Sequence, residues 1–254
     1  MQPFVPENSI VRKIWGSADT ILFIFAGASA EFALNKAVDW LYFTGRLPKD
    51  PLARLFSTVA YAQRIVFAEH DAALASIDSI TAIHKNVEQQ RGAAIPDWAY
   101  RDVLFMLIDY SIRSYQLLQR KLTVPEKEET FTVFYTIGLR MGLTGLPATY
   151  SEWEVMRAGH LQQNLIKSHY TKDLFKQYRK HLGIGRYLLL KQAQLLVIPA
   201  RVRRLLSFTN ISFLYPVVQV YKIARKIKLD GVLKNAVLPS NYKMQIRLLD
   251  AERR

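Results

Sequence analysis

His84 is the residue whose spacing most directly suggests a buried ligand. It shares one helical stripe with the apolar Ile77, Ile80 and Val87, at positions i, i+3, i+7 and i+10. A histidine on such a stripe faces a protein core rather than water. Two interpretations stay open: a core histidine that hydrogen-bonds a backbone carbonyl, or an axial ligand of haem iron or another metal.

Arg54 and Thr58 form a second pair with chemical potential, upstream of His84. Asp50 can cap a helix and Pro51 suits its first position, so the two residues, four apart, share one helical face. The ordinary interpretation is a surface arginine and a structural threonine. The functional interpretation places both over a ligand, where Arg54 binds a haem propionate or stabilises bound dioxygen and the Thr58 hydroxyl donates a hydrogen bond.

Residue types and spacings exclude several other kinds of site. The chain has no cysteine, which rules out disulfides, thiolate-held clusters, cysteine zinc sites and cysteine nucleophiles. Its histidines form neither H-x-x-x-H nor E-x-x-H, so di-iron carboxylate and zincin-type sites lose their main support. No glycine-rich phosphate loop follows a strand, and no G-x-S-x-G elbow occurs.

Helical periodicity dominates the elements that must position these residues. Caps and glycines predict helices over about residues 17–42, 97–122, 123–141, 151–169 and 171–183, besides the two in 50–92. Capping boxes are expected at Thr123 with Glu126 and at Ser151 with Glu154. Pro199 and Pro216 divide the apolar and basic stretch 186–228 into two or three more. With no strand signal, we expect an all-α fold, a bundle-like or globin-like stack of about eight to ten helices.

No linker or repeat divides the chain, so residues 1–254 are expected to form a single all-α domain. Within it we expect a core over about residues 15–185, followed by basic, apolar helices over about 186–230. The most apolar window, Ile21–Ala30, is too short for a bilayer span of about 20 residues. Because Met1–Asn8 does not resemble a signal peptide, we expect a cytoplasmic protein.

The formal net charge of +14, from 35 Lys and Arg against 21 Asp and Glu, favours anionic partners. In the C-terminal third, basic residues alternate with Leu, Ile, Phe and Tyr. This pattern is that of a solvated helix face or of a helix on a membrane surface. Nucleic-acid binding has no recognised motif behind it and is not expected.

Several separated segments resemble the MpaB and latex-clearing-protein (rubber oxygenase) family. The resemblance covers roughly Trp15 to Leu161. Its segments read DPLARLFST, IHKNV, WAYRDVLFMLIDYSIRSYQLL and KLTVPEKEETFTVFYTIGLRMGLTGLPATYSEWE.

The resemblance implies an all-α, globin-like fold and haem b as cofactor. By position, His84 would be the proximal iron ligand, and Arg54 and Thr58 would match an R-x-x-x-T pair on the distal side. The implied function is an oxidoreductase that uses dioxygen on an apolar alkene, isoprenoid or lipid-like. The basic C-terminal third adds the expectation of peripheral membrane contact. The alternative is a non-catalytic helical protein that binds haem or lipid or lies on a membrane surface.

Overall fold

The computed structural model describes residues 2–45 and 51–226, the side chains of 51–57 and 223–226 excepted. These residues form eleven helices and no strand, which confirms the all-α class and slightly exceeds the expected number. The helices are α1 (Ile10–Trp15), α2 (Ala18–Phe32), α3 (Val38–Phe43), α5 (Pro51–Val66), α6 (His70–Arg91), α7 (Asp97–Leu118), α8 (Val124–Arg140), α9 (Tyr150–Gln163), α10 (His169–Val197), α11 (Ala200–Leu206) and α12 (Leu214–Lys226).

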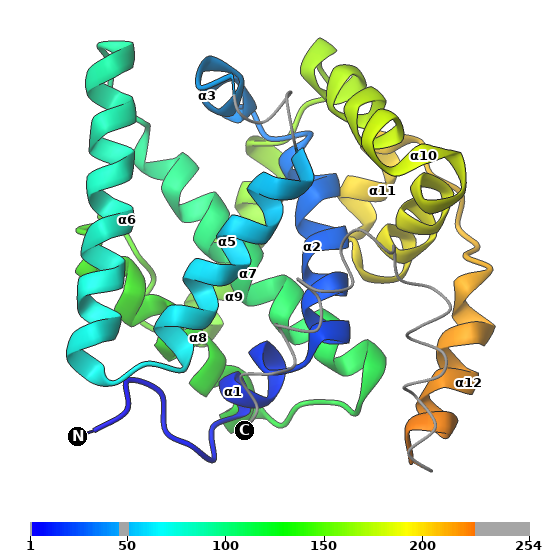
Figure 1. The fold of residues 1–254 in the computed structure, drawn as a ribbon, viewed down its shortest axis with the longest axis horizontal. Helices are drawn as coiled ribbons and strands as arrows, with labels where there is room; N and C mark the ends of the chain where they lie inside the picture. Colours follow the sequence, from blue (N-terminus) through cyan, green and yellow to red (C-terminus); the bar gives the residue numbers. More distant parts are fainter. Residues whose placement is uncertain (1, 46–50, 227–254) are drawn as a thin grey trace.

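Helix α2 is the centre of the fold, packed against α7 and against α10 (Figure 1). Its apolar run explains this position, because a helix that is apolar all round is stable only when enclosed. Gly27 of α2 lies close to α7. A Cβ atom there would lie 2.2 Å from Cδ1 of Tyr110, so glycine is what lets this ring pack against α2. A globin-like arrangement of the core stays a prediction.

The helix expected to run from residue 17 to about 42 is broken, so that prediction was wrong. The chain leaves the helix after Phe32, and the Asn35 side chain accepts a hydrogen bond from the Ala37 amide at 2.8 Å. The Lys36 amide donates to the Asn164 carbonyl at 2.9 Å. Tertiary pairing with the segment after α9 therefore replaces helical hydrogen bonds, and α3 starts in a new direction.

The caps were predicted with mixed success. The box of Thr123 and Glu126 at the start of α8 is confirmed. The box expected at Ser151 and Glu154 is wrong, because α9 is capped two residues earlier by Thr149, whose hydroxyl accepts from the Glu152 amide. The cap lies there because the Ala148 amide also donates to the Glu152 carboxylate at 2.8 Å.

Helix α10 continues through Gly183, where an end was expected. Gly183 has φ 73°, which only glycine adopts readily, so the residue kinks the helix instead of ending it. The predicted division of the chain near residue 185 falls inside this kinked element. Pro199 separates α10 from α11, whereas Pro216 lies in the first turn of α12. Among the helices of the described residues, none combines the length and apolar character that a bilayer span requires.

Candidate functional site

Helices α5 and α6 form a hairpin that presents the residues singled out from the sequence. Figure 1 shows the two helices joined at one end and diverging like a V. His84 is half-buried on α6, and its Nδ1 atom is shielded from solvent. On the same stripe Ile77 is fully buried and Ile80 half-buried. The apolar stripe expected for this helix is therefore the side that packs inward.

Tyr100 of α7 is the aromatic neighbour of His84. The two rings meet edge to face, with centroids 5.2 Å apart and planes at 85°. The Tyr100 hydroxyl donates to Oε1 of Glu88 at 3.1 Å, and the Ile95 amide donates to the same oxygen at 2.8 Å. Burial, and after it the Glu88 carboxylate, raise the pKa of Tyr100, so the hydroxyl keeps its proton and the ring is held beside the imidazole.

Thr58 and Arg54 lie on α5, the neighbouring helix. Thr58 is half-buried, while the Arg54 side chain lies outside the described residues. At about 1.5 Å of rise per residue, Arg54 is roughly 18 Å from the end of α5, and His84 is roughly 21 Å from the start of α6. The two backbone positions therefore reach similar heights along the hairpin, with Thr58 one turn nearer the connection.

Helix α3 is tied to the open end of this V. Arg91, at the end of α6, donates to Asp39 at 2.6 Å and lies 4.0 Å from the centre of the Trp40 ring. A guanidinium over an indole face adds about 0.5–2 kcal/mol to such a contact. Helix α3 is thus held against the end of α6, the helix that carries His84.

The surroundings of His84 are compatible with the one protein ligand that a haem requires. Within residues 2–45 and 51–226, no group of three or more His, Cys, Asp or Glu could hold a metal ion. A haem needs only an axial imidazole from the protein, since the porphyrin supplies the equatorial ligands. His84, with Ile77 and Ile80 on its stripe and the Tyr100 ring beside it, fits that requirement.

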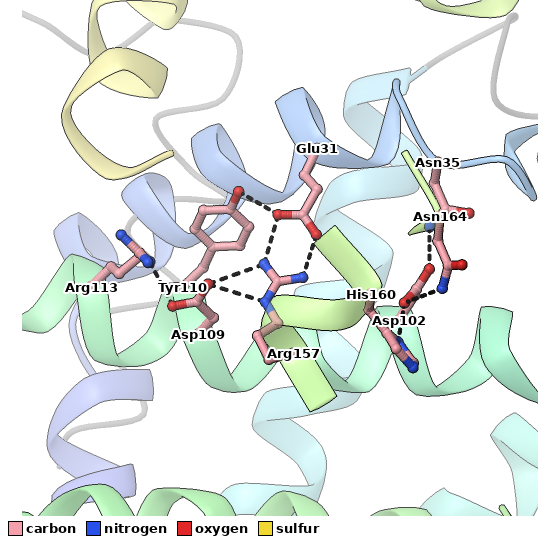
Figure 2. Close-up of polar contacts among 9 residues, drawn as sticks. All are labelled: Glu31, Asn35, Asp102, Asp109, Tyr110, Arg113, Arg157, His160 and Asn164. Atoms are coloured by element: carbon pink, nitrogen blue, oxygen red, sulfur yellow. Dashed lines mark hydrogen bonds and ion pairs between the residues drawn. The ribbon is translucent and has the colours of Figure 1, made fainter. Parts of the chain in front are cut away.

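A buried ion network joins α2, α7 and α9 at the centre of the fold (Figure 2). Arg157 donates to both carboxylate oxygens of Glu31, at 2.5 and 2.7 Å, and to Oδ2 of Asp109 at 3.0 and 3.2 Å. The Tyr110 hydroxyl donates to Glu31 at 2.8 Å, and Arg113 donates to Asp109 at 2.5 Å. Two cations thus balance two carboxylates, and each carboxylate has two side-chain partners.

The network keeps its charges despite burial. Burial acts to lower the pKa of Arg157, but the Glu31 and Asp109 carboxylates outweigh it and raise that pKa. Arg157 is therefore a permanent cation, and its bonds to Glu31 and Asp109 fix the relative positions of α9, α2 and α7. It belongs to the scaffold rather than to the hairpin that carries His84.

A second polar cluster surrounds Asp102 on α7 (Figure 2). Its Oδ2 accepts from Asn35 Nδ2 at 2.8 Å, and its Oδ1 accepts from Asn164 Nδ2 at 3.1 Å. Oδ1 also contacts His160 Nδ1, and the His160 ring packs on Phe105 with centroids 5.1 Å apart. Asp102 therefore orients His160 and holds α2 and α9 together. Asp102 and Tyr100 are two residues apart on α7, so they project from nearly opposite faces.

Sequence reasoning missed Tyr100 and both polar clusters. The signals were charged residues inside apolar helical runs: Glu31 after ILFIFAGASA, and Asp109 within LFMLIDYS. A charge in such a place is almost never buried alone. Its partner Arg157 comes from a third helix, which no local spacing reveals.

Comparison with known proteins adds one finding. A family model described as "ER-bound oxygenase mpaB/B'/Rubber oxygenase, catalytic domain" matches residues 14–222. None of the curated proteins compared with the chain matches it. The matched range runs from α1 to α12 and includes the whole α5–α6 hairpin.

Proposed function

The chain belongs to the mpaB/rubber oxygenase catalytic-domain family, and we propose that it acts as a haem b-dependent oxygenase. The family supports an oxygenase role in general terms. The observation that carries the haem proposal is the position of His84 on the inward stripe of α6, with its Nδ1 shielded and its ring against Tyr100.

His84, Tyr100, Thr58 and Arg54 each have a role in this proposal. His84 would hold the haem through Nε2, and the edge contact with Tyr100 would keep the imidazole in one orientation. Thr58 and Arg54, on the neighbouring helix α5, would provide a hydroxyl donor and a cation. The hydroxyl and the cation would stabilise negative charge that develops on dioxygen, because charge-assisted hydrogen bonds are strongest away from water.

When bound, haem iron supplies the activation of dioxygen. The family description names rubber oxygenases, and rubber is an apolar polyalkene. We therefore propose an apolar alkene, isoprenoid or lipid-like, as substrate. One double bond and one dioxygen molecule become two carbonyl groups, so the net reaction balances without an external reductant.

The test is oxygen uptake by the hemin-reconstituted protein with squalene as the probe alkene, combined with mass spectrometry of the products. We expect uptake to match carbonyl formation and to exceed that of free hemin. The Thr58→Val variant should bind hemin normally but turn over more slowly, because it keeps the shape and loses the donor. A protein that binds hemin yet consumes no more oxygen than free hemin would instead be a non-catalytic haem carrier.

A further inference from the structure

The excess of positive over negative charge is confined to one part of the chain. Residues 155–229 contain fifteen Lys and Arg and a single acid, Asp173. The remainder contains twenty of each sign, so the whole net charge of +14 arises from this part. In the fold, most of it forms α10, α11 and α12, which Figure 1 shows together at the side of the molecule away from α6.

One side of α12 is fixed to the body of the protein. Val218 is buried, and the Tyr221 hydroxyl donates to Asp19 of α2. Just before the helix, the Ser212 hydroxyl donates to the Gln192 carbonyl at 3.0 Å, and the Phe213 amide donates to the Gln192 side chain at 3.0 Å. These contacts, just before the helix and at residues 218 and 221, hold one side of α12 against the body of the protein.

The neighbouring side of α12 is apolar and exposed. Phe213 is 71% exposed, Val217 47% and Val220 60%, at the i, i+4, i+7 spacing of one stripe. Ile211, in the preceding loop, is 78% exposed. The helix ends in Lys222, Arg225 and Lys226. A helix with an outward apolar stripe and only basic charge has the pattern of one that lies in a membrane interface.

We propose that α12 and the loop before it, residues 211–222, dock on the anionic surface of a lipid bilayer. The apolar stripe would enter the boundary between headgroups and acyl chains, and the basic residues of α10–α12 would face the phosphate and carboxylate groups. The cytoplasmic leaflet carries such a negative potential, so this surface places the protein on the cytoplasmic side.

The charge distribution favours lipid over other partners of this surface. A second copy of the chain would bring two strongly positive segments together, which like-charge repulsion opposes. Nucleic acid would match the charge but not a stripe of Phe and Val. A bilayer with acidic headgroups satisfies both features. Since α12 and α6 lie at opposite ends of the molecule in Figure 1, docking does not depend on haem at His84.

The test is co-sedimentation of the full chain with vesicles, either pure phosphatidylcholine or phosphatidylcholine mixed with phosphatidylserine. We expect binding to the mixed vesicles that weakens as salt rises, and little binding to the neutral ones. The double variant Phe213→Ser with Val217→Ser should bind at least roughly tenfold more weakly, since it loses two apolar side chains from the interface. Both positions are exposed, so far-ultraviolet circular dichroism should be unchanged.

Two matched variants control for surface changes elsewhere. Val155→Ser removes a valine that is 76% exposed on α9, and Lys121→Glu reverses an exposed charge in the balanced part of the chain. Both should bind like the wild type, whereas Lys222→Glu should weaken binding. Equal binding to neutral and mixed vesicles, or equal loss in the control variants, would overturn the proposal. So would self-association that the Phe213 and Val217 changes abolish, because the stripe would then be a protein–protein interface.

Discussion

Arg157 and Glu31 form a bidentate ion pair at the centre of the fold, with N–O distances of 2.5 and 2.7 Å. They lie 126 residues apart in the sequence, and both are almost completely buried. Asp109 completes the set from α7. Three helices therefore meet at one guanidinium, and their relative positions depend on it.

Replacing Arg157 by Met should lower the free energy of unfolding by about 3–5 kcal/mol, because two buried carboxylates lose their shared cation. Urea unfolding at neutral pH measures the change. Arg113→Ala is the control, since Arg113 is 40% exposed and contacts only the rim of the same network. It should cost no more than about 1 kcal/mol. Equal losses in the two variants would show that burial of Arg157 is not what matters.

The Gly27→Ala variant should be destabilised by about 1–3 kcal/mol, since the added methyl group meets the Tyr110 ring at 2.2 Å and overpacks the α2–α7 contact. The same change at Gly159 of α9 should stabilise by about 0.5–1 kcal/mol, because no atom lies within 4 Å of that Cβ and alanine favours the helix. Thermal unfolding of both variants tests the opposite signs. A stabilised Gly27→Ala would contradict the close packing of these helices.

The Glu126 carboxylate at the start of α8 gives the stability a defined pH dependence. The hydrogen bond from Arg120, aided by those from Thr123, lowers the pKa of Glu126 from 4.5 to about 2. Its contribution is therefore present above about pH 4.5 and is lost as the pH falls towards 2. Glu126→Gln should cost about 0.5–1 kcal/mol at pH 7 and almost nothing near pH 2. Urea unfolding across this range, with Glu128→Gln as the matched exposed change, measures it; a pH-independent difference would contradict this assignment.

Tyr100 offers a separate test of how His84 is oriented. Tyr100→Leu removes the edge contact, and hemin should then dissociate roughly tenfold faster, with a shifted Soret band. Tyr100→Phe keeps the ring and loses only the hydrogen bond to Glu88, so it should stay close to the wild type. Stopped-flow transfer of hemin to an acceptor protein measures both rates. If both variants lose hemin tenfold faster than the wild type, the Tyr100 hydroxyl rather than the ring edge holds His84 in place.

The sequence was sufficient for the class of fold and for most helix starts and ends, because caps, glycines and apolar stripes are local. Gly92 ends α6 in the left-handed conformation, and Thr123 starts α8, both as expected. The break after Phe32 was missed because the Asn35 side chain donates to Asp102 and the Lys36 amide donates to the Asn164 carbonyl, and both partners lie far along the chain. Gly183 was misjudged because packing on α2 carries α10 past a residue that would end an isolated helix.

The candidate site was only partly accessible to sequence reasoning. The apolar stripe around His84 could be predicted from its helical period. The contact of Tyr100 with His84 could not, because α7 has buried residues on several faces. Glu31 ends the apolar run Ile21–Ala30, which is therefore too short for a bilayer span. Its role as partner of Arg157 needed the arrangement of three helices in space (Figure 2).

The most direct test of the haem proposal is a hemin titration followed in the Soret region. It compares the wild type with His84→Ala and with His70→Ala, which changes an exposed histidine at the other end of the same helix. We predict one shared spectrum for wild type and His70→Ala, and a lost or shifted Soret band in His84→Ala that added imidazole restores. A His84→Ala protein with the wild-type spectrum and affinity would contradict the assignment of His84 as the axial ligand.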